Sequence, residues 1–210
     1  DWAKAGYEVA YAQFTIDAKS TKVAHTLNGK NVQIKKQSHY FIVSGKDFRF
    51  KLNFDTGLLE SYYYKDQLLM KEGPKPNISR AKLDNDSSHF KDIMSYLTLD
   101  GEPTVGKSTD CNYMLTTKWN SSYLLDSKTK TPGTIEMSYL IEDTGAVTVR
   151  MKLDFTKTKV KKFIKVGTRL SLAKGTENVS WYGNGDDESY CDRQTYTRVG
   201  AYTSTVNKMF

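Results

Sequence analysis

The sequence lacks the patterns on which several classes of function depend. No apolar run approaches the roughly 18 residues of a membrane-spanning helix, and no signal-peptide pattern opens the chain. Neither a glycine-rich phosphate loop nor a Gly-x-Ser-x-Gly nucleophile motif occurs. The 3 histidines, His25, His39 and His89, have no partner at metal-ligand spacing. We therefore expect no membrane span, no nucleotide site, no serine nucleophile and no metal site.

Cysteine and arginine are also scarce. Cys111 and Cys191 fit no metal or redox spacing, so a single disulfide and two free thiols are both open. The net charge of +7 comes from 31 basic residues, mostly lysines, scattered among 24 acidic ones. The densest run, residues 157–165, alternates as the solvent face of a strand does, which favours a solvated lysine surface over nucleic-acid or membrane binding.

The composition that is present suits a folded, strand-rich protein. Hydrophobic residues make up 38% of the 210 positions and aromatic residues 12%, enough for a substantial core. Tyrosine is the commonest aromatic residue, with 14 copies against 9 of phenylalanine, and this favours strands with half-exposed aromatic faces.

Hydrophobic residues recur with a period of two along most of the chain. In residues 48–54 apolar positions alternate with polar ones, and the turn Asp55-Thr56-Gly57 leads into residues 58–64, which predicts a hairpin. Residues 135–141 and 147–153 form a second predicted hairpin around another Asp-Thr-Gly turn. The best helical candidate, residues 88–97, is short. The sequence therefore predicts an all-β fold, an antiparallel β-sandwich.

The pattern changes near the start of the chain. Residues 6–16 favour one strand, and residues 18–37 are polar and weakly patterned. We expect residues 1–17 to be the last strand of a preceding domain, residues 18–38 a linker and residues 39–210 the main domain. Neither end has the polar character usual at a domain terminus, so we expect a piece of a longer protein.

Two segments concentrate chemically useful side chains. Residues 73–86 carry two prolines, an arginine and an Asp-Asn-Asp run, and residues 181–193 carry two glycines, three consecutive acids and three aromatic rings. An EF-hand is excluded because His89 and Ser95 replace the required glycine and glutamate. The candidate residues, either sugar-binding or supporting a sugar cleft, are Arg80, Asp84, Asn85, Asp86, Trp181, Glu188, Tyr190, Asp192 and Arg193.

Two explanations of these acids stay open. Glycosidase chemistry needs two carboxylates that face each other across a cleft. Buried Asp–Arg pairs that fix loops are the more frequent arrangement, and the sequence alone does not bring any two of these acids together.

Three segments together resemble the C-terminal small-chain domain of family 2 β-galactosidases. The first runs from Asp47 to Asp86, with its Gly-Pro-Lys-Pro-Asn and Arg-Ala-Lys-Leu-Asp-Asn-Asp motifs, and the second covers residues 181–193 and 199–206. The third, residues 2–10, is similar to the last strand of the immunoglobulin-like domain that precedes this domain in such enzymes.

The resemblance implies a β-supersandwich like that of galactose mutarotases. It implies that the catalytic glutamates, and any Mg or Na ion, lie on a (β/α) barrel outside this chain, so that the chain itself has no catalytic residue, cofactor or metal. Its partners would be the rest of the β-galactosidase chain, a galactoside through that enzyme, and further copies in a homo-oligomer, with no nucleic acid and no membrane. The compartment would be a bacterial cytoplasm or periplasm.

Two other functions compete with this one. A free-standing carbohydrate-binding module would use rings and carboxylates such as those of Trp181, Tyr182, Tyr190 and Asp192. A mutarotase-like epimerase rests on fold analogy alone and would need a histidine acid, for which His89 is the candidate.

Overall fold

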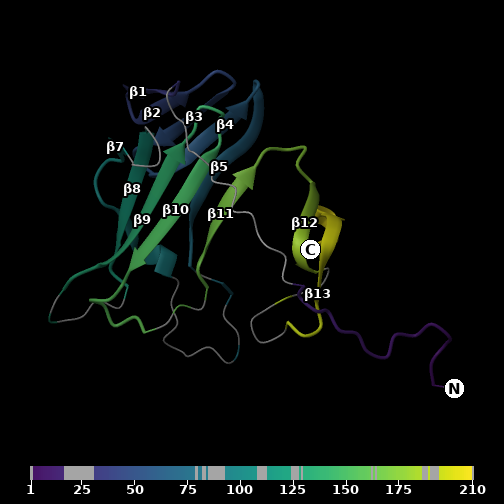
Figure 1. Ribbon diagram of the computed structural model, residues 1–210. Coiled ribbons are helices and arrows are strands. Elements are labelled where there is room, and N and C mark those ends of the chain that lie inside the picture. The colour runs from purple at the N-terminus through teal and green to yellow at the C-terminus, as the bar shows by residue number, and fades with distance from the viewer. Residues whose placement is uncertain are drawn as a thin grey trace. The chain divides into compact units, whose positions relative to one another are not determined.

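The computed structural model describes residues 2–16, 31–78, 80, 81, 84, 93–107, 113–123, 128, 130–161, 163, 165–185, 189 and 194–209. These residues belong to two compact units (Figure 1). The larger unit covers residues 25–173, and the smaller unit combines residues 1–24 with residues 174–210. The division into residues 1–17, 18–38 and 39–210 stays a prediction.

The larger unit contains two antiparallel sheets. The six-stranded sheet has the order β1-β2-β3-β4-β5-β11, with β1 (Gln33–Gln37), β2 (Tyr40–Ser44), β3 (Phe48–Asn53), β4 (Leu59–Tyr64), β5 (Gln67–Asn77) and β11 (Gly167–Leu172). The five-stranded sheet has the order β10-β9-β8-β6, and β7 also pairs with β8. Its strands are β6 (Leu97–Leu99), β7 (Thr104–Gly106), β8 (Tyr113–Ser121), β9 (Gly133–Ile141) and β10 (Val147–Asp154).

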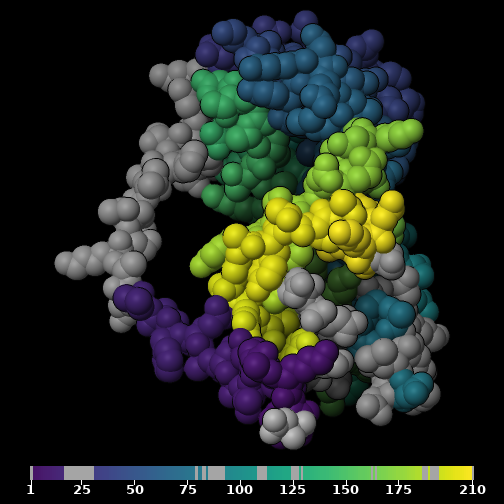
Figure 2. Space-filling view, turned by 90° about the vertical axis from the view of Figure 1, so that its right-hand side faces the viewer, coloured from purple at the N-terminus to yellow at the C-terminus, as the bar shows by residue number. Residues whose placement is uncertain are grey.

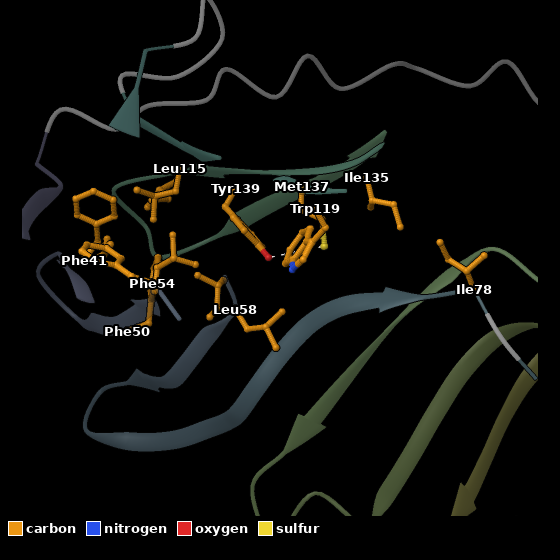
Figure 3. Close-up of a cluster of buried hydrophobic side chains, with 14 of the residues drawn as sticks. Phe41, Phe50, Phe54, Leu58, Ile78, Leu115, Trp119, Ile135, Met137 and Tyr139 are labelled. Carbon is orange, nitrogen blue, oxygen red and sulfur yellow. Dashed lines mark hydrogen bonds between the residues drawn. The ribbon is translucent and has the colours of Figure 1, made fainter. Parts of the chain in front are cut away.

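One hydrophobic core joins these two sheets and makes the larger unit a sandwich. Figure 3 shows Phe41 and Phe50 of the first sheet pointing toward Leu115 and Tyr139 of the second. Tyr139 is fully buried, its hydroxyl donates to the Pro74 carbonyl oxygen at 3.2 Å, and burial raises the pKa of its phenol. The antiparallel β-sandwich predicted from the sequence is confirmed.

Both predicted hairpins are present, and their turns use glycine as expected. In β3 the side chains of Phe48, Phe50 and Leu52 are buried, while the charged residues between them are exposed. Gly57 has φ +70° and Gly145 has φ +93°, a conformation that costs other residues free energy. The turn at Gly145 is fixed across the sandwich, because the Tyr62 hydroxyl donates to its carbonyl oxygen at 2.5 Å.

The described residues of the smaller unit form one antiparallel hairpin. Strand β12 (Asn178–Gly185) pairs with β13 (Arg198–Thr205), and the short 3-10 helix η2 (Val206–Lys208) follows. The described residues 2–16 form no strand here, so the strand expected over residues 6–16, as the last strand of a preceding domain, stays a prediction. A strand needs a neighbouring backbone for its hydrogen bonds, and this segment instead meets β13 through side chains.

Two further segments contain less regular structure than the sequence indicated. The helical candidate at residues 88–97 contains the short 3-10 helix η1 (Ile93–Tyr96), and β6, which pairs with β8, begins at Leu97. Residues 88–92 lie outside the described set. The described residues of the lysine-rich run 157–165 form no strand, although their lysines are exposed as predicted. Within the described part of the chain, no helix is long and apolar enough to cross a membrane.

Candidate functional site

The hairpin of the smaller unit carries a stacked aromatic pair. Trp181 of β12 lies opposite Tyr202 of β13, and their rings stack at 5.4 Å with planes 27° apart. The indole N–H of Trp181 donates to the Asn184 carbonyl oxygen at 3.0 Å. Gly185 leaves room for this pair, since an added Cβ would come within 2.8 Å of the Tyr202 ring. The Trp181 side chain is therefore held on one ring face by Tyr202 and at its indole N–H by the Asn184 carbonyl oxygen.

The N-terminal segment lies against this hairpin, and Figure 2 shows it in purple beside the yellow C-terminal residues. Glu8 forms an ion pair with Arg198, the first residue of β13. The Arg198 guanidinium also covers the Tyr11 ring, 3.9 Å from its centre. The Tyr11 hydroxyl shares its proton between the carbonyl oxygens of Thr195 at 2.9 Å and Tyr196 at 2.6 Å.

A glutamine side chain covers part of the outer edge of β13. The Gln13 amide N–H donates to the Val199 carbonyl oxygen at 2.9 Å, and the Gln13 amide oxygen accepts from the Val199 N–H at 2.7 Å. The side-chain amide thus makes the two hydrogen bonds that a neighbouring strand would make. We call residues 8–13 the strap, because their side chains hold the N-terminal segment to the hairpin.

A groove of about 730 Å³ opens between the strap and the hairpin. Its walls combine tyrosine rings with one carboxylate and one guanidinium, and the lining residues are Glu8, Val9, Ala10, Tyr11, Gly185, Thr195, Tyr196, Arg198 and Tyr202. Tyr196 is 70% exposed, so its ring is available to a molecule in the groove. This volume lies within the range of small-molecule sites.

Three of the nine residues predicted from the sequence are described. The Trp181 ring stacks on the ring of Tyr202, which lines the groove. Arg80 donates to the neighbouring Ala81 carbonyl oxygen at 2.8 Å, and Asp84 is exposed; both belong to the larger unit. The other six, together with His89 and both cysteines, lie outside the described residues: Asn85, Asp86, Glu188, Tyr190, Asp192 and Arg193.

Among the described residues, the two carboxyl groups with shifted pKa values are both exposed. The hydroxyl and backbone N–H of Thr156 hydrogen-bond to Asp154 and lower the pKa of its carboxyl. The Gly175 N–H lowers the pKa of Glu177 in the same way. A glycosidase general acid needs a raised pKa, so neither group suits that task. Among the described residues, no three or more His, Cys, Asp or Glu side chains are grouped to hold a metal ion.

The sequence did not point to the strap residues or to Tyr196 and Arg198. Glu8 and Arg198 are 190 positions apart, and Gln13 and Val199 are 186 apart. No motif connects two such distant stretches, and their residue types are ordinary. The only signal was the resemblance of both stretches to parts of one family.

An antiparallel β-sandwich is the class of protein that the described residues define. Within that class, the family model described as β-galactosidase small chain matches residues 44–210. The chain belongs to the β-galactosidase small chain family.

Curated relatives agree with this assignment. The chain is 25% identical to the β-galactosidase of Priestia megaterium over 213 residues, 26% to that of Clostridium acetobutylicum over 207 and 24% to that of Streptococcus thermophilus over 217. These alignments cover 99%, 97% and 100% of this chain, but only 20%, 22% and 20% of the relatives. The chain therefore spans about a fifth of the length of these β-galactosidases.

Proposed function

We propose that this chain is a non-catalytic part of a β-galactosidase. The whole enzyme would remove terminal β-D-galactose residues, and this part would pack on the catalytic domain, wall the sugar cleft and contribute to oligomer contacts. The observation that carries the proposal is the alignment, in which nearly the entire chain corresponds to about a fifth of each relative.

The chemistry of the described residues supports an accessory role. A retaining glycosidase needs two carboxyl groups about 5 Å apart, one of them with a raised pKa. The shifted carboxyl groups, Asp154 and Glu177, are exposed and their pKa values are lowered. In this proposal the acid, the nucleophile and any Mg or Na ion belong to the remaining four-fifths of the enzyme, which is also the chain's main partner.

The purified 210-residue chain is expected to hydrolyse no aryl β-galactoside, because it would lack the catalytic carboxylates. The assay uses protein expressed in a host without β-galactosidase, and the Priestia megaterium enzyme serves as the positive control. Turnover that stays with the chain through two chromatographic steps and scales with its concentration would refute the proposal.

Sugar binding by the chain itself is a second candidate. It is favoured by aromatic side chains that remain accessible on and beside the hairpin, since Tyr182 is 81% and Tyr196 70% exposed. Aromatic rings stack on the apolar faces of sugars, and exposed tyrosines can offer such a ring. This function is compatible with the accessory role and would apply to the same polypeptide.

A further inference from the structure

We propose that the groove between the strap and the hairpin is a binding site for a neutral pyranose sugar. The proposal rests on the sugar-binding candidate above and locates it at Tyr196, Glu8 and Arg198. Neither the family match nor the names of the relatives assigns a site to this groove.

The tyrosine rings that line the groove can pack against a sugar ring. Tyr196 presents an exposed ring, and Tyr202 also lines the groove. Tyr202 is fixed in place, because its ring stacks on Trp181 and its hydroxyl donates to the Arg198 carbonyl oxygen at 2.8 Å. A pyranose has an apolar C–H face that can lie on Tyr196 while its edge contacts the fixed ring of Tyr202.

The Glu8–Arg198 ion pair supplies hydrogen bonds of both kinds. A guanidinium has five N–H donors and a carboxylate has about four acceptor positions, so one ion pair leaves groups of both kinds for sugar hydroxyls. Both side chains are about half exposed at the groove. Their charges cancel, and this favours a neutral polyol over an anionic sugar.

The two sides of the groove come from opposite ends of the sequence. Glu8 and Tyr11 belong to the strap, whereas Tyr196 and Arg198 belong to the hairpin side. A sugar that contacts both sides should hold them together, so binding should also stabilise the smaller unit against unfolding.

Calorimetric titration of the 210-residue chain with galactose and lactose tests the site. We expect saturable binding that Tyr196→Ala weakens about tenfold, the effect of losing one stacking ring. Tyr196→Phe should retain binding because it keeps the ring, and Tyr196→Leu should lose it because it keeps only apolar bulk. Tyr7→Ala is the matched control, an exposed tyrosine of the smaller unit that does not line the groove, and it should bind like the original chain.

The outcomes separate the site from the function on which it rests. Sugar binding that is unchanged in both Tyr196→Ala and Tyr196→Leu would overturn the groove and leave the sugar-binding candidate intact. A flat titration with the original chain would overturn both, without touching the accessory role. Tighter binding of galacturonate than of galactose would overturn the preference for a neutral sugar. Circular dichroism of each variant confirms that the hairpin is still folded.

Discussion

Replacing Phe50 by alanine is expected to lower the free energy of unfolding of the larger unit by about 3–5 kcal/mol. Phe50 is 1% exposed, and its ring stacks on Phe48 at 6.3 Å and on Tyr62 at 5.7 Å. The variant loses the transfer free energy of the ring and leaves a cavity between the two sheets. Because Tyr62 also holds the turn at Gly145, the cavity should loosen that turn as well.

Urea unfolding followed by Trp119 fluorescence measures this effect, since Trp119 is the tryptophan of the larger unit. Replacing Trp2 and Trp181 by phenylalanine removes the signal of the smaller unit. Val166→Ala is the control, because Val166 is 53% exposed and lies outside the strands, and it should cost less than about 0.5 kcal/mol. A loss below about 1 kcal/mol for Phe50→Ala would contradict the sandwich core as described.

Gly57→Ala is expected to destabilise the larger unit by about 2–4 kcal/mol, from two separate causes. Gly57 has φ +70°, a backbone conformation in which the Cβ of an alanine would come too close to the alanine's own backbone. The added Cβ would also lie 2.3 Å from Thr117 Cγ2 and 2.7 Å from Leu99 Cδ1, both in the opposite sheet. Those side chains are packed between the sheets and must move to admit it.

Gly101→Ala separates the two causes. Gly101 has φ +76°, but a Cβ there would meet nothing within 4 Å, so only the backbone cost of about 1 kcal/mol applies. The difference between the two variants in urea unfolding therefore measures the close approach of the β3–β4 turn to the second sheet. Equal losses in the two variants would show that this approach is not tight.

The strands of the larger unit could be predicted because each follows a local rule. In β3 every second residue is buried, and the sequence shows the same alternation of Phe48, Phe50 and Leu52 with charged residues. The turns at Gly57 and Gly145 were also recognisable, because few residues other than glycine adopt a positive φ at low cost. Local sequence determines such features, so no knowledge of distant contacts was required.

The segment over residues 6–16 could not be predicted in the same way. Its apolar residues suit a strand, yet Val9, Phe14 and Ile16 are 77–88% exposed and no strand forms. Whether an alternating segment becomes a strand depends on a neighbouring backbone, which its own sequence does not reveal. The groove could not be predicted for the same reason, since the strap meets the hairpin across nearly the whole length of the chain.

The aromatic and acidic segment at residues 181–193 illustrates both what the sequence could predict and what it could not. The sequence indicated Trp181 as a candidate residue, and in the structure its ring stacks on Tyr202, which lines the groove. The most exposed ring in the groove is that of Tyr196. The sequence around Tyr196 gave no indication that it lines the same groove as Glu8 and Tyr11.

The native size of the polypeptide tests the accessory role most directly. An antibody raised against the 210-residue chain should detect, in the source organism, one band several times larger than 23.9 kDa. A size about five times larger is expected, because the chain aligns with 20% of the Priestia megaterium β-galactosidase. The same band should carry β-galactosidase activity after native electrophoresis. A single band at 23.9 kDa would contradict the proposal and leave sugar binding as the leading function.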